Sequence, residues 1–356
     1  MLETMSLPPG VAINQANIGT TIRPSSTALL VIDSEDRYND FVAKRNSQPG
    51  QYNYNPYNFV ISKNQSIMNG FFTRLAVTEI VFPWAIPNIN EKTASIYVVY
   101  NGVRYLISFN NTYASGQPLL AVGFYTPNQL AVALQAAVRY VSGSTTFQMK
   151  YGYAYKSTNT LTYVENIPAF EYSTGSTDTV YFLPLDYQSS AYPYPTTTRQ
   201  LYDLLGFNTA DNSTPGVNVS YGNPTYAQAI KYVDIICPTL VYNQALKDTS
   251  SAAISQDSLC RVYLANADNS TNEVFTATDI SGSGHEFCPP GCAPTTLYRQ
   301  FNVPKYIQWV PNQPVAGSLV FQVLDDQGQI LDPSTYTSLV NGQPLDWQMS
   351  LLVSEN

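Results

Sequence analysis

The chain has 356 residues, of which 44% are hydrophobic and 12% are charged, and its formal net charge is −8. Because about 25% charged residues is usual in a soluble domain, polarity here is carried by uncharged side chains, which argues against disorder and against a coiled coil. The negative sign argues against a nucleic-acid-binding surface. The 28 tyrosines and 24 prolines favour strands joined by long ordered loops, in about two domains or one large β-domain with insertions.

The chain starts with a segment that has no regular pattern. Residues 1–25 mix Pro, Asn, Thr and Gly, which indicates an extended arm, and they lack the basic start and apolar stretch of a secretory signal. Alternating apolar residues then predict strands at 28–32, 57–62 and 71–82, the last of which ends at Pro83. No apolar run reaches the length of about 18 residues that a membrane-spanning helix needs.

The clearest hairpin covers residues 95–109. Its turn, Asn101-Gly102, suits a two-residue type I′ turn because both central positions need positive φ. After a helix, short strands are predicted at 146–155, 160–165, 169–172 and 179–183.

The best helix is predicted at 126–141. Thr126 suits the N-cap, and Gln129 completes a capping box. The apolar residues that follow recur at helical spacing: Leu130, Ala133, Leu134, Ala137, Val138 and Val141. A shorter helix, 198–205, is predicted to end at Gly206.

The last third of the chain is again rich in strand patterns. Residues 265–296 interrupt it as a polar insertion, which we expect to be a surface loop. Strict alternation in 345–353 predicts that Trp347, Met349 and Leu351 face the core. The other predicted strands are 232–242, 258–264, 297–301, 305–310 and 318–324.

These elements predict an all-β fold, a jelly-roll β-sandwich with insertions and one or two short helices. We expect the sandwich to be built from 26–264 and 297–356 and to include the helix-bearing middle, 123–207. The arm 1–25 and the loop 265–296 lie outside it.

No catalytic or nucleotide-binding motif is present, so we expect neither an enzyme nor a cofactor. Carboxylates cluster at Asp33, Glu35 and Asp36, where they could bind Ca²⁺ or serve a glycosidase. The simpler interpretation is a solvated turn in which Arg37 pairs with a carboxylate. The pair Asp325–Asp326 is interpreted as a hairpin turn.

Four cysteines and a single histidine are present. Cys237 and Cys260 lie in strand-like segments and are expected to be small buried apolar groups. His285, Cys288 and Cys292 lie close together, so they are the metal candidates, but their spacing is not that of a zinc finger. A disulfide between the last two cysteines ranks above the metal, free thiols remain an alternative, and no metal site is predicted.

Several segments together resemble the minor capsid (penton) proteins of virophages, polinton-like viruses and related tailless icosahedral DNA viruses. They are VIDSEDRY (31–38), NPYNFVISKN (55–64), RLAVTEIVFPWAIPNIN (74–90), GFYTPNQLAVALQAAV (123–138), DLLGF (203–207), YVDIICPTLVYNQALKD (232–248), CRVYLAN (260–266), SLVFQVLDDQGQILD (318–332) and DWQMSLLVSE (346–355).

The resemblance implies a single jelly roll that forms a homopentamer at the fivefold vertices of the virion, beside trimers of the major capsid protein. It also implies synthesis and assembly inside the host cell.

Three functions are therefore weighed. The first is a structural capsid protein, for which uncharged tyrosine-rich surfaces suit contact with other copies. The second is a receptor- or carbohydrate-binding β-sandwich on a virion or cell surface, and the third is a hydrolase that uses carboxylates such as Asp33 and Glu35. A host receptor or fibre would contact the 265–296 loop.

Overall fold

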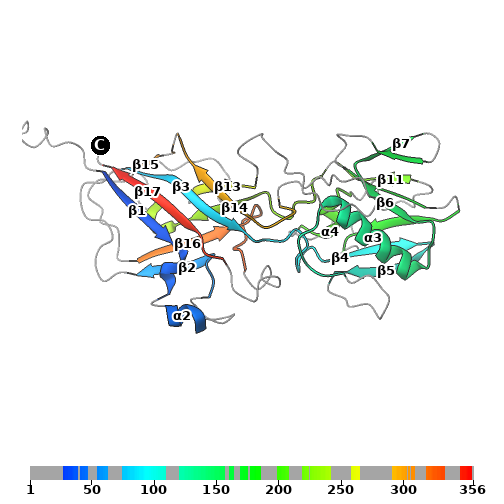
Figure 1. The fold of residues 1–356 in the computed structure, drawn as a ribbon, viewed down its shortest axis with the longest axis horizontal. Coiled ribbons are helices and arrows are strands. Elements are labelled where there is room, and N and C mark those ends of the chain that lie inside the picture. The colour runs from blue at the N-terminus through cyan, green and yellow to red at the C-terminus, as the bar shows by residue number, and fades with distance from the viewer. Residues whose placement is uncertain are drawn as a thin grey trace, which may run out of the picture.

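The chain forms two lobes that lie side by side along the long axis of the molecule (Figure 1). The computed structural model describes residues 27–38, 41–46, 54–62, 74–109, 120–156, 160–163, 169–174, 177–185, 199–207, 219–223, 225–241, 258–264, 291–302, 304, 306–308, 318–332 and 345–354. The lobe that contains both ends of the described chain is called the jelly-roll lobe (27–86 and 230–354). Residues 89–227 form the other, the inserted lobe.

The jelly-roll lobe is built almost wholly from strands. Its helical pieces are short: η1 (Ser34–Arg37), α2 (Phe41–Asn46) and α6 (Pro238–Val241). The strands are β1 (Thr27–Asp33), β2 (Asn58–Ser62), β3 (Arg74–Trp84), β12 (Tyr232–Ile236), β13 (Ser258–Tyr263), β14 (Thr295–Gln300), β15 (Tyr306–Gln308), β16 (Ser318–Leu324) and β17 (Gln348–Ser354).

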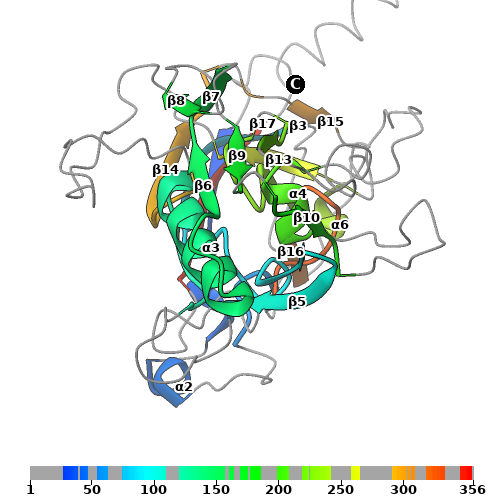
Figure 2. The same cartoon turned by 90° about the vertical axis from the view of Figure 1, so that its right-hand side faces the viewer.

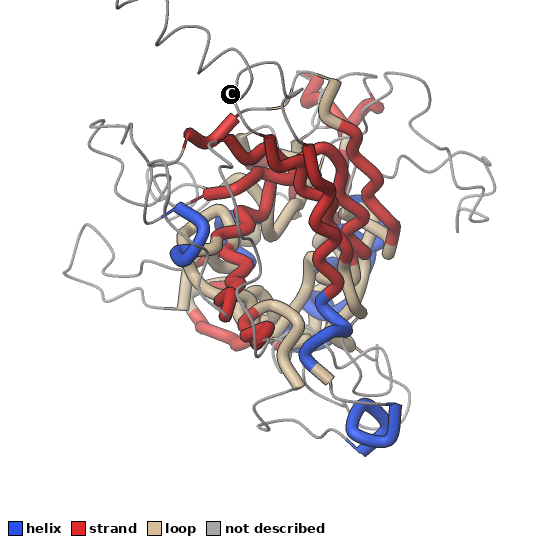
Figure 3. Tube along the Cα trace, turned by 90° about the vertical axis from the view of Figure 1, so that its left-hand side faces the viewer, coloured by secondary structure: helices blue, strands red, loops and turns tan. Residues whose placement is uncertain are grey.

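These strands form two antiparallel sheets. Sheet I has the order β1-β17-β3-β14, and β15 also pairs with β3; sheet II has the order β13-β12-β16-β2. Counted along the chain without β15, sheet I contains the first, eighth, third and sixth strands of this lobe, and sheet II the fifth, fourth, seventh and second. This interleaving of distant strands is the jelly roll, so the predicted fold is confirmed. Strands and loops dominate the described trace (Figure 3).

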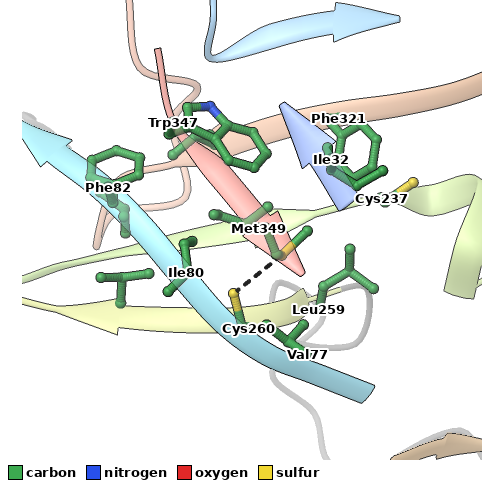
Figure 4. Close-up of a cluster of buried hydrophobic side chains, with 14 of the residues drawn as sticks. Ile32, Val77, Ile80, Phe82, Cys237, Leu259, Cys260, Phe321, Trp347 and Met349 are labelled. Atoms are coloured by element: carbon green, nitrogen blue, oxygen red, sulfur yellow. Dashed lines mark hydrogen bonds between the residues drawn. The ribbon is translucent and has the colours of Figure 1, made fainter. Parts of the chain in front are cut away.

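The space between the two sheets is filled by large apolar side chains from both (Figure 4). Trp347 is fully buried, its ring lies tilted against that of Phe59 at a centroid distance of 5.7 Å, and its Nε1 donates to the Pro56 carbonyl at 2.8 Å. Met349 and Leu351 are buried beside it, which confirms the predicted core face. The strand itself begins only at Gln348, because the backbone N–H of Trp347 is bonded to the Ser34 hydroxyl.

The inserted lobe combines three small sheets with one long helix, α3 (Pro127–Ser142), and a short one, α4 (Leu201–Leu204). Its strands pair as β10-β4-β5, β11-β9-β6 and β7-β8. Their bounds are β4 (Ser95–Tyr100), β5 (Val103–Ser108), β6 (Gln148–Tyr151), β7 (Tyr153–Lys156), β8 (Thr160–Tyr163), β9 (Phe170–Ser173), β10 (Val180–Leu183) and β11 (Val219–Tyr221). Seen end-on, α3 lies along one side of this lobe (Figure 2).

Local sequence signals account for the helix and the hairpin. Thr126 accepts a hydrogen bond from the backbone N–H of Gln129, whose side chain returns one to the N-cap, as the predicted capping box requires. Asn101 and Gly102 both have positive φ, 48° and 77°, which confirms the type I′ turn.

Three predicted elements differ from the structure. The strand predicted at 146–155 is divided into β6 and β7, because Gly152 between them has a φ of 77°, outside the strand region. The strand predicted at 232–242 ends at Ile236, since Pro238 begins the helix α6. The strand predicted to end at Pro83 continues through it to Trp84, at positions where β3 is paired with β14 but not with β17.

The lobes have separate hydrophobic cores. Buried side chains between Ile89 and Ala227 cluster with one another, whereas those of the jelly roll form a second cluster. We had expected residues 123–207 to be part of the sandwich; α3 and the strands around it instead bury their apolar faces against each other. The loop predicted at 265–296 and the arm at 1–25 fall largely or wholly outside the described residues, and β14 already begins at Thr295.

Two stretches of chain connect the lobes and are bonded to each other. The buried amide of Asn88 donates to the carbonyls of Tyr125 and Ala227, at 2.8 and 3.2 Å, and accepts from the Tyr125 N–H. Beside them, Arg199 of the inserted lobe pairs with Asp326 of the jelly-roll lobe at 3.0 Å. Asp326 also accepts from the Lys231 N–H at 3.2 Å.

Candidate functional site

The predicted acidic cluster is used to build the fold. Asp33 caps η1 by accepting from the Glu35 N–H at 2.8 Å, and its other oxygen accepts from Gln348 at 2.6 Å. Glu35 pairs with Lys44 at 2.8 Å, and Asp36 is exposed. The structure therefore assigns capping and ion pairing to the carboxylates that a glycosidase or Ca²⁺ site would need.

Arg37 pairs with a carboxylate, as predicted, but not in a solvated turn. Its side chain is buried and pairs with Asp346, just before β17. Asp346 also accepts from Lys44 at 2.9 Å and from Ser34 at 3.0 Å. Burial alone would raise the pKa of Asp346, but the hydrogen bonds from Arg37 and Lys44 outweigh it and hold that pKa below its ordinary value. The network ties the start of β17 to η1.

The other acidic pair lies in a turn, as predicted. Asp325 accepts from the backbone N–H groups of Gln327 and Gln329, at 2.9 and 2.8 Å, which is the local bonding that aspartate provides in turns. Asp326 has the further role of joining the two lobes through Arg199.

The cysteines agree with a structural role. Cys237 and Cys260 are free, and burial raises the pKa of each thiol to about 12, so neither is a reactive thiolate. The Cys260 sulfur lies 4.0 Å from that of Met349 in the core (Figure 4). Cys292 is buried and disulfide-bonded. His285 and Cys288 lie outside the described residues, among which no group of three potential metal ligands is found.

One buried acid was not singled out by the sequence. Glu171 of β9 lies between the core residues Phe170 and Tyr172, where alternation predicts an outward-facing side chain, yet it is only 4% exposed. Its Oε2 has no hydrogen-bond partner, and burial raises its pKa to about 7. Lys150 of β6 is its cross-strand neighbour. Glu171 is buried because other parts of the fold cover this face of β9, and no pattern in the sequence indicates that they do.

The outer face of sheet I is unusual for a sheet that faces water. Strand register places its outward side chains in rows across β1, β17, β3 and the edge strands β14 and β15. Three of these rows are Leu29–Leu352–Ala76–Tyr306, Val31–Ser350–Glu79–Gln300 and Asp33–Gln348–Val81–Tyr298, and a fourth, Thr27–Ser354–Arg74, carries an exposed arginine. Glu79 accepts from Ser350 at 2.8 Å and from Tyr298 at 3.2 Å, so its charge is bonded within the face.

The outer face of sheet II is similarly poor in charge. Its only described ion pair is bidentate: Arg261 donates to both oxygens of Asp234, at 2.7 and 2.8 Å. Those hydrogen bonds hold the pKa of Arg261 above its ordinary value. The guanidinium also lies 3.8 Å from the ring centroid of Tyr232, which meets Tyr263 edge-on at 5.7 Å.

Within the described residues, no helix is both long and apolar enough to cross a membrane.

Of the comparisons with known proteins, only the one with solved structures finds a match. No family model and no curated protein matches the chain. The crystal structure of the selenomethionine-labelled mavirus penton protein matches at 10% identity with a TM-score of 0.44, over 94% of this chain and 100% of that one. A chain in the 3.5 Å cryo-EM structure of the Sputnik virophage matches at 12% identity and a TM-score of 0.38, over 94% and 98%.

A virophage penton protein is thus among the solved structures that this chain resembles. Both identities and TM-scores are low, and the jelly-roll order described above rests on the strand pairings of this chain alone.

Proposed function

We propose that this protein is a structural component of a viral capsid that assembles with other copies of itself. The observation that carries the proposal is the jelly roll whose sheet I exposes Leu29 and Val31, 62% and 55% exposed, on its outer face. Antiparallel sheets that face water normally alternate apolar and polar side chains. A face that is apolar on the outside is typical of a surface covered by a partner.

The finer proposal is a homopentamer at the fivefold vertices of an icosahedral double-stranded DNA virus, beside trimers of the major capsid protein. The sequence segments that resemble penton proteins support it, since they recur in order along most of the chain. The mature protein would then be found in the virion, after synthesis and assembly inside the host cell.

Size-exclusion chromatography with light scattering, followed by negative-stain microscopy, tests the proposal on the purified full chain. We expect a closed ring with fivefold symmetry at micromolar concentration. A monomer that stays monomeric up to about 100 µM would contradict self-assembly, because such an interface would be weaker than a specific complex needs. A ring of another symmetry would retain the capsid role and overturn the vertex position.

We place two further contacts in the same proposal. Residues 1–25 would contact a neighbouring subunit or an inner capsid component, since a segment without its own core gains order only on a partner. Deleting them should leave the β-fold intact, as judged by circular dichroism, and reduce incorporation into particles. Normal incorporation would contradict this role.

The 265–296 segment would be the place where a host receptor or a fibre binds. Replacing residues 267–284 by a short Gly/Ser linker should preserve the oligomer and abolish attachment. Loss of the oligomer would instead identify the segment as part of an interface between subunits. Glycan-dependent binding by the intact protein would favour the alternative function, a receptor- or carbohydrate-binding sandwich.

A further inference from the structure

Sheet I exposes apolar groups at both of its edges. On the β1 edge these are Leu29 and Val31, and on the opposite edge they are Tyr298 and Tyr306, which are 53% and 47% exposed. A single exposed leucine needs no explanation, but an apolar set spread across one sheet face marks an interaction surface.

The β1 edge also lacks the usual protection against pairing. Edge strands of monomeric proteins are commonly blunted by lysine, proline or a bulge. The seven residues of β1, TALLVID, contain none of these, and their register with β17 is unbroken.

Sheet II presents a second exposed patch on the other side of the same lobe. Tyr263 is 54% exposed at the β13 edge, beside Tyr232 and the Arg261–Asp234 pair. The next strands add half-buried Val320 and Val60, which lie opposite one another in β16 and β2. Tyrosine and arginine are the residue types enriched where proteins bind each other.

We infer that the outer face of sheet I in one copy packs on the outer face of sheet II in the next copy. This inference rests on the proposed self-assembly and names the surfaces that perform it. A contact between two different faces of the same chain is heterologous, and repetition of such a contact closes a ring when the rotation per copy allows it.

Charge decides between this pairing and one in which two sheet I faces meet. The outer rows of sheet I carry two acids, Asp33 and Glu79, and one base, Arg74, which lies in the row Thr27–Ser354–Arg74. The face therefore has an excess of acid, and two such faces would bring like charge together, which is unfavourable in a buried contact. Sheet II offers Arg261, whose side chain is 34% exposed, while its acid Asp234 is 2% exposed. The acidic face therefore complements the face with an accessible guanidinium.

Both faces are also surfaces of β-sheets, which can stack on one another. Stacked sheets pack about 10 Å apart with their strands roughly aligned, and the side chains of both interdigitate. Sheet I brings aliphatic side chains at the β1 edge, and sheet II brings tyrosines at the β13 edge. Aromatic rings on aliphatic groups make favourable contacts between sheets.

The test places one lysine on each face. Val31→Lys changes the sheet I face, and Tyr263→Lys changes the sheet II face; both positions are more than half exposed, so the fold should tolerate them. Val103→Lys is the matched control, because Val103 is an equally exposed valine, 51%, on an edge strand of the inserted lobe. The readouts are light scattering for the oligomer and circular dichroism for the fold.

We expect each face variant to be a folded monomer, with self-association weakened on the order of a hundredfold, and the control to form the wild-type ring. Mixing the two face variants supplies the decisive result. Each retains one intact face, so the mixture should form a one-to-one heterodimer and no ring.

The alternatives give different results. If Val31→Lys still assembles, sheet I is not the interface and the inference is wrong, while the proposed capsid function stands. If one variant is a monomer and the other still self-associates, the contact is between like faces, and the inference is again wrong. If both variants are monomers and their mixture stays monomeric, the contact involves another segment, and the inference is wrong as well. If the wild-type chain itself does not assemble, both the inference and the proposed function fail.

Discussion

In the jelly-roll lobe the partly buried acid Asp346 pairs with Arg37 and Lys44, whereas Glu171 of the inserted lobe has a carboxylate oxygen without a hydrogen-bond partner. The first arrangement stabilises the ionised carboxylate, and the second stabilises the protonated one. The two lobes should therefore respond to pH in opposite directions.

The chain provides separate probes for the two lobes. Two of its three tryptophans, Trp84 and Trp347, are buried in the jelly-roll core, so tryptophan fluorescence contains a signal from that lobe. The one long helix among the described residues, α3, lies in the inserted lobe, so ellipticity at 222 nm contains a strong signal from that lobe. Two separate cores allow the two signals to change independently.

The largest expected effect comes from Trp347→Ala. Removing this fully buried ring leaves a cavity beside Phe59 and Phe321 and deletes the bond to the Pro56 carbonyl. We expect the free energy of unfolding followed by fluorescence to fall by about 3–5 kcal/mol, with little change at 222 nm.

The matched variant is Phe182→Ala, at an equally buried position in the inserted lobe. It should show the reverse pattern, since Phe182 stacks on Phe207 at 5.1 Å within the other core. Equal shifts in both signals would mean that the lobes unfold as one cooperative unit. A change below about 1 kcal/mol for Trp347→Ala would contradict its place in the core.

The next effect concerns the paired acid. Asp346→Asn leaves the buried guanidinium of Arg37 without its anion, and breaking a buried pair of this kind costs about 3 kcal/mol. In the wild type, the pKa of Asp346 is lowered from 3.8. This stabilisation is therefore complete above that ordinary value and is lost as the pH falls through the lower folded pKa.

Chemical denaturation followed by fluorescence between pH 2 and 7 measures this effect. The wild type should lose stability at the acidic end of this range, and the variant should show a smaller loss. Glu35→Gln is the control, because the Glu35–Lys44 pair is more than a third exposed and should change stability by less than about 1 kcal/mol. If Asp346→Asn loses as much stability at acidic pH as the wild type does, another group is responsible for that loss.

The unpaired acid, Glu171, should make stability depend on pH in the opposite direction. The pKa of Glu171 is raised from 4.5 to about 7, so the folded state retains a proton that the unfolded state releases. Stability of the inserted lobe should therefore fall as the pH rises from about 4.5 to 7, by roughly 2–3 kcal/mol. Glu171→Gln should remove this slope and raise the melting temperature at pH 8, measured at 222 nm.

Glu91→Gln serves as the control for this variant, since Glu91 is an exposed glutamate of the same lobe. It changes the net charge equally and should leave the wild-type slope in place. If Glu171→Gln and the wild type show the same pH dependence, the carboxyl of Glu171 is solvated in solution.

The sequence predicts the elements that depend on local chemistry. The capping box at Thr126, the turn at Asn101 and the alternation around Trp347 each involve residues within a few positions of one another, and all three are confirmed. The jelly-roll order came partly from composition and partly from the resemblance to penton proteins, since strand pairing across hundreds of residues has no local signature.

Contacts between residues that are far apart in the sequence could not be predicted. Arg37 pairs with Asp346, which lies 309 positions away in the sequence. Glu171 is buried by parts of the fold that the pattern of its own strand does not specify. The separate core of the inserted lobe was missed for the same reason. An apolar stripe on α3 predicts a buried face but does not say which sheet buries it.

The smallest expected effect concerns the contact between the lobes. Asp326 accepts hydrogen bonds from Arg199 of the inserted lobe and from the Lys231 N–H, and its side chain is only 5% exposed. Asp326→Asn should change the stability of each lobe little but weaken their coupling by about 1 kcal/mol, because the partner arginine is partly exposed. The fluorescence and 222 nm transitions should then separate further than they do in the wild type.

A double-mutant cycle with Arg199→Gln isolates this contact. The interaction energy between the two substitutions should be about 1 kcal/mol, whatever each loses separately through the Lys231 N–H and through the Ala229 carbonyl, to which Arg199 also donates. Raising the salt concentration should separate the wild-type transitions in the same way and affect the double variant less, because only the wild type has this ion pair to screen. Strictly additive effects would mean that the Arg199–Asp326 ion pair does not contribute to the coupling of the lobes.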